Sequence, residues 1–159
     1  MENLFQKLSS EKKLHYIDSL GEYYNPQEAF FLLEVLNNNK EYDLVRIAAI
    51  ESFSLKCLAS ESDEVQESCA RNLLEVAEKD EDTDVRNYAL QALSWFKSIE
   101  WLPQIIADIV LNQNEDPLVR ESAFAILVSQ KQNASSQQIF NKLLSDSVFG
   151  KSAERYIHD

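Results

Sequence analysis

The sequence predicts an all-α fold, and three observations carry that prediction. The chain of 159 residues holds 45% apolar residues but only two Gly and three Pro, which favours helices with short turns over a sandwich with many tight loops. Apolar residues recur at helical spacing along most of the chain. A Val-Arg pair with Ala three residues after the Arg occurs three times, at Val45-Arg46, Val85-Arg86 and Val119-Arg120. Internal similarity at a period of this length is typical of helical repeat arrays.

Residues 1–24 do not match the repeat. Two short apolar patterns in this stretch, Leu4 to Leu8 and Leu14 to Leu20, predict one or two helices that end near Gly21. Terminal repeats of an array cover the end of its core and are commonly atypical. We therefore interpret residues 1–24 as an N-terminal cap.

The rest of the chain predicts about four antiparallel helix pairs in a single domain. Their expected bounds are 25–57, 62–96, 99–130 and 135–157. Asn25-Pro26 and Asp116-Pro117 are strong start signals, because an N-cap side chain precedes Pro at the first helical position.

Some details of the pairs follow from spacing. Glu28 is placed to complete a capping box, and Ser135-Ser136 are expected to cap the last pair. The expected core faces are Phe30, Leu33 and Leu36 in the first pair and Ile105, Ile106, Ile109 and Val110 in the third.

Cysteine and histidine give no sign of a metal site. We expect Cys57 and Cys69 to be two small core residues in a reducing compartment, with a disulfide or a reactive thiol as the alternative. His15 and His158 are far apart in sequence, and no Cys/His cluster has zinc spacing. No Gly-rich phosphate loop is present. The sequence therefore predicts no metal, no cofactor and no catalytic residues.

The charge is strongly acidic and unevenly distributed. There are 27 acids and 15 bases, and residues 41–84 hold 13 acids and 4 bases, a net charge of −9 out of −12. This sign disfavours nucleic acid and anionic membranes as partners, and favours a basic protein. No apolar run approaches membrane-spanning length, and Met1-Glu2-Asn3 lacks the start of a signal peptide. We therefore expect a cytoplasmic location.

The segments Asp82-Thr83-Asp84-Val85-Arg86 and Asp116-Pro117-Leu118-Val119-Arg120 resemble HEAT repeats, nearest to the HEAT-like repeats of phycobilisome-lyase type. The resemblance covers roughly residues 25–157. It implies an α-solenoid whose second helices line a concave face. The sequence departs from the pattern at Tyr42, where an Asp is usual, and at Gly150, where the Arg is missing. Chromophore-lyase activity is not implied, because no chromophore-binding residues match.

The recurring Arg46, Arg86 and Arg120 have two interpretations. We favour a structural ladder in which each Arg bonds turn carboxylates such as Asp82 or Asp116 and carbonyls of the neighbouring repeat. The alternative is a basic ladder that grips a ligand.

Acids cluster at the turn inside each repeat. In a solenoid such turns stack along one edge, so these acids are expected to form a partner-binding ridge. The alternative is ordinary helix capping on a solvated edge. The turn acids are Glu41, Asp43, Asp80, Glu81, Asp82, Asp84, Glu115 and Asp116.

A third set of residues shares one face of the second helices. Tyr88, Gln91 and Trp95 lie two, five and nine residues after Arg86, and Glu51 is the equivalent of Gln91 in the first repeat. Tyr88 and Trp95 could anchor a partner. In the alternative, Trp95 packs into the next helix pair beside Phe96 and Trp101.

Together these features predict a non-catalytic module that binds a basic protein. Size, charge and fold resemble the HEAT-like immunity proteins of bacterial toxin systems, which implies an inhibitor that covers a basic, nuclease-like toxin domain. The alternatives are a general HEAT scaffold or adaptor and a lyase-type enzyme or accessory. A HEAT-like DNA-repair glycosylase is disfavoured by the net charge.

Overall fold

The computed structural model describes residues 2–157, and all regular structure within them is α-helix, as the sequence predicts. The helices fall into two compact units that divide between Phe96 and Lys97. The N-terminal unit contains α1 (Glu2–Phe5), α2 (Ser10–Asp18), α3 (Pro26–Leu36), α4 (Asp43–Leu58), α5 (Asp63–Lys79) and α6 (Thr83–Leu93). The C-terminal unit contains α7 (Leu102–Ile105), α8 (Ala107–Leu111), α9 (Pro117–Ser129), α10 (Ala134–Leu143) and α11 (Gly150–Glu154).

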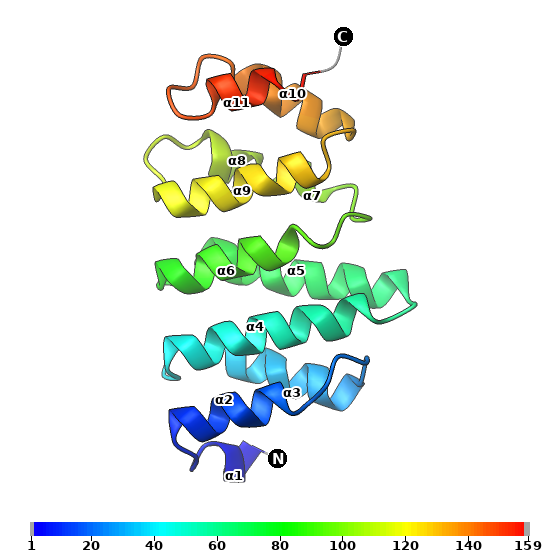
Figure 1. The fold of residues 1–159 in the computed structure, drawn as a ribbon, viewed down its shortest axis with the longest axis vertical. Coiled ribbons are helices and arrows are strands. Elements are labelled where there is room, and N and C mark those ends of the chain that lie inside the picture. The colour runs from blue at the N-terminus through cyan, green and yellow to red at the C-terminus, as the bar shows by residue number, and fades with distance from the viewer. Residues whose placement is uncertain (1, 158–159) are drawn as a thin grey trace. The chain divides into compact units, whose positions relative to one another are not determined.

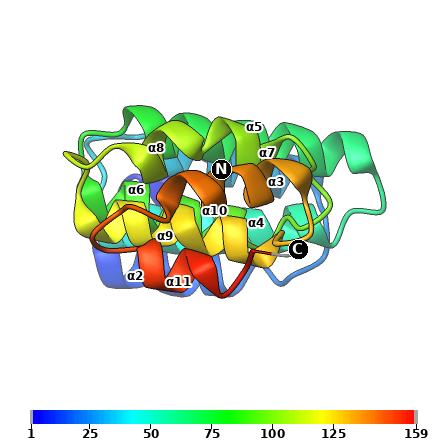
Figure 2. The same ribbon diagram turned by 90° about the horizontal axis from the view of Figure 1, so that it is seen from above.

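The helices of the N-terminal unit form two layers. α2, α4 and α6 lie side by side in one layer, and α3 and α5 lie in the other (Figures 1 and 2). α3 packs against α4, and α5 packs against α6. The apolar faces that meet between the layers include Leu36, Ile50, Leu73 and Leu90, all fully buried.

Capping side chains fix the start of α3, α5 and α6, whereas the N-cap of α4, Tyr42, makes no side-chain hydrogen bond. The Asn25 side chain accepts hydrogen bonds from the amides of Gln27 and Glu28, and Pro26 occupies the first turn of α3. Ser62 caps α5 and Asp82 caps α6. These side chains satisfy amides that have no partner inside the helix. Gly21, at a φ of +69°, supplies the left-handed turn between α2 and α3.

Two sequence predictions about α3 are wrong. Phe30 is 62% exposed, and the buried face is formed instead by Phe31, Leu32, Val35 and Leu36. The run Phe30 to Leu33 offers two apolar faces one residue apart, so spacing alone did not choose between them. Glu28 does not close a capping box, because its carboxylate is bound to Lys56 of α4.

The C-terminal unit differs from the predicted third and fourth pairs in three details. The first helix of the third pair is divided into α7 and α8 at Ile106. Ile105 is 44% exposed, whereas Ile106, Ile109 and Val110 are buried as expected. Asn133 caps α10, so the prediction of a Ser135-Ser136 cap is wrong. The start of α9 at Asp116-Pro117 is confirmed.

Cys57 of α4 and Cys69 of α5 form a disulfide, which corrects the expectation of two reduced core cysteines. Both residues are buried, as expected, at the place where the end of α4 meets α5. The two residues are 12 apart in sequence, so the bridge closes the α4–α5 connection.

Within residues 2–157, no helix combines the length and the apolar character that crossing a membrane requires.

Candidate functional site

The three repeated arginines make the same first contact. The Nε atom of each donates to a carbonyl at the end of the preceding helix: Arg46 to Leu36 (2.9 Å), Arg86 to Ala77 (2.8 Å) and Arg120 to Val110 (3.0 Å). The acceptor lies nine or ten residues earlier, in the same helix pair and not in the neighbouring one as predicted. Each Arg therefore satisfies a helix-end carbonyl that has no partner within its own helix.

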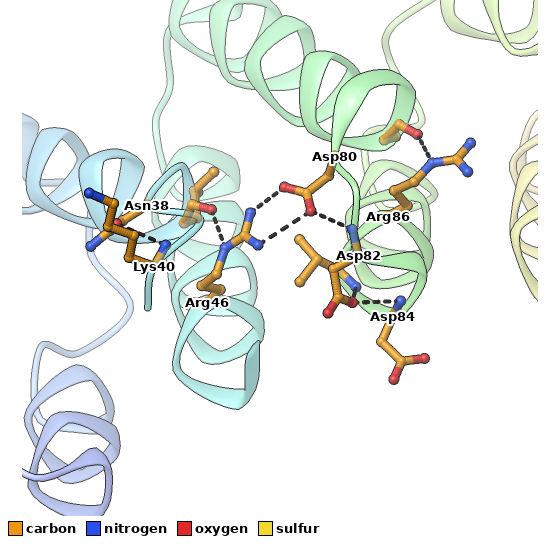
Figure 3. Close-up of polar contacts among 10 residues, drawn as sticks. Asn38, Lys40, Arg46, Asp80, Asp82, Asp84 and Arg86 are labelled. Carbon is orange, nitrogen blue, oxygen red and sulfur yellow. Dashed lines mark hydrogen bonds and ion pairs between the residues drawn. The ribbon is translucent and has the colours of Figure 1, made fainter. Parts of the chain in front are cut away.

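Two of these arginines also bind an aspartate from a later turn. The two terminal guanidinium nitrogens of Arg46, Nη1 and Nη2, donate to the Asp80 carboxylate, with Nη1 3.3 Å from Oδ1 (Figure 3). Arg120 binds Asp146, with Nη2 2.7 Å from Oδ2. The expected partners Asp82 and Asp116 are instead the N-caps of α6 and α9. For Arg46 and Arg120 the structure thus contains the predicted kind of contact, a carboxylate from a turn, but the aspartate is not the predicted one.

The structure brings the first two acidic turns together. A hollow of about 530 Å³, here called the turn-edge hollow, lies between the α3–α4 and α5–α6 turns. Five of the predicted turn acids line it: Glu41, Asp43, Asp80, Glu81 and Asp82.

Most of these five carboxylates already have a structural partner. Glu41 binds the buried Lys13 of α2 at 2.6 Å, Asp80 binds Arg46, and Asp82 caps α6. Asp43 accepts a hydrogen bond from the amide of Leu44. Glu81 alone of the five is exposed and makes no ion pair with a residue between 2 and 157.

The bases of residues 41–84 are all engaged in ion pairs. Arg46 binds Asp80, Lys56 binds Glu28, and on the surface of α5 Arg71 and Lys79 bind the acids four residues before them. Seven exposed acids of the same stretch have no ion pair with any described residue. They are Glu51, Glu61, Asp63, Glu64, Glu78, Glu81 and Asp84. The negative charge of this stretch is therefore not compensated locally.

The residues predicted for the face of the second helices come from α4, from α6 and from the segment just after α6, and α4 and α6 lie side by side (Figure 1). We call Glu51, Leu55, Gln91 and Trp95 the second-helix face. Glu51 and Gln91 are exposed, and Leu55 and Trp95 are each 40% exposed. Tyr88, three residues before Gln91, is half-buried. The face thus presents an acid and two large apolar side chains to solvent.

A hollow of about 300 Å³ borders this face between α2 and α4. Glu51 and Leu55 form its α4 wall, and Asp18 and Glu22 contribute two further acids. Asp18 and Glu22 were not among the predicted site residues, because residues 1–24 were interpreted only as an N-terminal cap.

Sequence analysis also missed the buried lysine of α4. Lys56 is fully buried, and its Nζ donates to Glu28 (2.5 Å), the Leu20 carbonyl (2.9 Å) and the Tyr23 carbonyl (3.4 Å). It thereby anchors the α2–α3 loop to α4. Its position three residues after the buried Phe53 placed it on the apolar face of the helix, a signal that was available from spacing.

One carboxylate of the C-terminal unit has a perturbed pKa. Burial of Asp146 favours its neutral form, but the amides of Phe149 and Val148 and the Arg120 guanidinium outweigh burial and hold the pKa of this carboxyl below its usual value. Asp146 is therefore an ionised partner for Arg120 at neutral pH.

No group of three His, Cys, Asp or Glu side chains within residues 2–157 is arranged to hold a metal ion. Comparison of the chain with protein-family models, with curated proteins and with solved structures finds no match.

Proposed function

We propose that this protein is a HEAT-like repeat protein that binds a basic protein partner and performs no catalysis. The repeat assignment is supported by the Nε-to-carbonyl bond that Arg46, Arg86 and Arg120 share. One contact repeated at three equivalent positions is what a helical repeat array requires of its structural residues.

The observation that carries the binding proposal is the uncompensated charge of residues 41–84. Every base of this stretch is already paired within the chain, whereas seven exposed carboxylates form no ion pair with any residue between 2 and 157. A concentrated negative field speeds the capture of a basic protein and orients it before contact. Glu78, Glu81 and Asp84 place part of this field at the α5–α6 turn.

The second-helix face supplies the contacts that would hold the captured partner. Leu55 and Trp95 offer exposed apolar area, and Trp is enriched among residues that dominate binding energy. Glu51 stands beside Leu55 in the hollow between α2 and α4, where it can receive a basic side chain of the partner. The expected mechanism is therefore steered association followed by apolar contact.

The most specific form of this proposal is an immunity-type inhibitor that covers a basic, nuclease-like toxin domain. An acidic surface of this kind offers carboxylates to the cationic groups with which such a toxin holds phosphates. The expected cytoplasmic location remains a prediction, and the Cys57–Cys69 disulfide favours an oxidising compartment instead. Labelling of thiols in protein taken directly from its cells decides between the two.

The test is an affinity pull-down at low and high salt, followed by identification of the bound proteins. Wild type is compared with the triple variant Glu78→Gln, Glu81→Gln, Asp84→Asn, which leaves Asp80 and Asp82 in their structural roles. The matched control is Glu100→Gln, Glu121→Gln, Glu154→Gln, which removes the same charge from exposed acids of the C-terminal unit.

We expect the pull-down to capture one dominant basic protein. Its binding should weaken as the salt concentration rises, be lost with the triple variant and be retained with the control. Capture of several proteins of mixed charge, unaffected by salt and equal in all three proteins, would contradict it and indicate a general scaffold.

A further inference from the structure

We infer that the groove between α3 and α5 is a second docking site, which takes an apolar side chain from a basic amphipathic helix. Most of the residues that line it belong to α3 and α5, and these two helices form the layer of the N-terminal unit opposite α4 and α6 (Figure 2). The inference does not depend on the proposed function.

The groove is open and mainly apolar. Its volume is about 270 Å³, and it lies between Phe30 and Leu33 of α3 and Val65 of α5. An apolar cavity of roughly 150 Å³ accommodates one benzene ring. The space therefore suits one large apolar side chain together with part of the helix that carries it.

Phe30 is the clearest sign that this groove is incomplete in the isolated chain. Its side chain is 62% exposed at the groove wall, although the neighbouring Phe31 is 4% exposed. Burying this ring in a complex would remove further apolar area from water, which favours binding.

The floor of the groove is held in place by the core. Phe53 of α4 is 3% exposed, and Cys69 of α5 is joined to Cys57 by the disulfide. This bridge ties α5, at a residue that lines the groove, to the end of α4. The site is therefore formed before the ligand arrives, which lowers the entropic cost of binding.

The charges at the groove select a basic ligand. Glu64 lines it, no Lys, Arg or His does, and Glu64 has no ion pair with any described residue. Glu61 and Asp63, three residues and one residue before Glu64, are also exposed and form no ion pair with any described residue. A Lys or Arg one turn away from the inserted apolar side chain would meet this acidic end.

The walls of the groove favour a helical ligand over an extended one. Both walls are α-helices, whose backbone groups are bonded within the helix and offer no edge for strand addition. An extended segment would leave its own amides and carbonyls unpaired against an apolar surface. A helix satisfies these groups internally and presents side chains at i, i+3 and i+4.

The test uses a synthetic peptide of about five helical turns, with one stripe of Leu and Lys on its other faces, labelled for fluorescence anisotropy. Two peptide controls accompany it. One replaces the Leu stripe by Ala at the same charge, and the other replaces Lys by Glu. The Lys-Leu peptide is expected to bind, and each control peptide at least about tenfold more weakly.

Protein variants locate the site. Phe30→Ala removes the wall and Ser68→Phe fills the groove, and each is expected to weaken binding at least about fivefold. Leu44→Ala, a loss of exposed apolar area outside the groove, is expected to change affinity less than about twofold. Glu64→Gln is expected to weaken binding more than Glu81→Gln, which removes the same charge at the opposite end of α5.

Circular dichroism confirms that each variant is folded. Equal affinities for Phe30→Ala, Ser68→Phe and Leu44→Ala would overturn the inference, as would equal binding of the Leu and Ala peptides. Equal effects of Glu64→Gln and Glu81→Gln would show that the peptide follows the general charge, and would also overturn it. None of these outcomes bears on capture by the second-helix face.

Discussion

Arg46 and Asp80 form an ion pair between the first turn of α4 and the loop that joins α5 to α6. Arg46 lies near the start of α4, and Asp80 directly follows α5, 34 residues later (Figure 3). The same Arg donates to the Leu36 carbonyl, and the same Asp accepts from the amide of Asp82. One guanidinium therefore connects the end of α3, the start of α4 and the α5–α6 turn. Arg120 and Asp146 form the same connection in the C-terminal unit.

Breaking this pair is expected to destabilise the fold. The Arg46 and Asp80 side chains are 5% and 12% exposed, so Arg46→Ala leaves an almost buried carboxylate without its partner. The expected loss is about 3 kcal/mol in the free energy of unfolding, measured by urea denaturation. Glu81→Gln, at the exposed neighbour, should change the value by less than about 0.5 kcal/mol. An unchanged urea midpoint for Arg46→Ala would contradict the structural role.

Lys56→Met tests the buried lysine. This change retains the apolar stem but removes the donor for Glu28 and for the Leu20 and Tyr23 carbonyls. We expect a loss of about 3 kcal/mol, because an acid and two carbonyls lose their partner. Lys40→Met is the control, since Lys40 is exposed. Equal thermal midpoints for the two variants would show that the three contacts do not hold the α2–α3 loop.

The lowered pKa of Asp146 should make the stability of the fold depend on pH in the acidic range. Its pKa in the folded state is lower than the ordinary value of 3.8, so the folded state binds this proton less readily than the unfolded chain does. The resulting stabilisation is complete above pH 3.8 and is lost as the pH falls further, through the folded-state pKa. When the free energy of unfolding is measured in small steps from about pH 5 to about pH 3, a range that brackets the ordinary value of 3.8, wild type should lose more stability than Asp146→Asn.

The control for this titration is Asp108→Asn, which removes an exposed carboxyl outside the Arg120 network. It should follow the wild-type curve. Parallel curves for wild type and Asp146→Asn would show that Asp146 contributes nothing to acid sensitivity.

Two measurements test the disulfide: the number of free thiols in the denatured protein, and the free energy of unfolding without the bridge. Denatured protein that has not met a reductant should show no free thiol, because Cys57 and Cys69 are the only cysteines and are paired. The double variant Cys57→Ser, Cys69→Ser should lose about 3 kcal/mol, as estimated for a loop of this size from the entropy of the unfolded chain. Two free thiols and a variant of unchanged stability would contradict the structure.

The sequence predicted the helices of this fold far better than the side-chain contacts between them. The N-caps Asn25 and Asp116 followed from local chemistry, which acts within four residues. The ion pairs of Arg46 and Lys56 join residues 28 or more apart, so they depend on how the helices stack. Spacing could show that Arg46 recurs, but not that its partner is Asp80 and not Asp82.

The candidate site was predicted in outline only. The turn acids do meet along one edge in the N-terminal unit, but Glu41, Asp80 and Asp82 have structural partners that the sequence could not show. Glu81 and Asp84 are left to face solvent. The exposure of Leu55 and Trp95 also required the structure, because the helix pattern fits a buried Trp95 equally well.

The roles proposed for the acids and for the second-helix face separate kinetically. Steering acts on the association rate, whereas apolar contact acts mainly on dissociation. The Glu78→Gln, Glu81→Gln, Asp84→Asn variant should therefore slow association, with little change in dissociation. Trp95→Ala should speed dissociation by about tenfold or more, with little change in association.

The most direct measurement is the association rate constant of the captured partner at rising salt concentration, for wild type and for the triple acid variant. The account predicts that the wild-type rate falls by at least about tenfold between low and high salt, and that the variant starts slower and falls less. Rates that coincide for the two proteins and do not change with salt would contradict binding through the uncompensated acids.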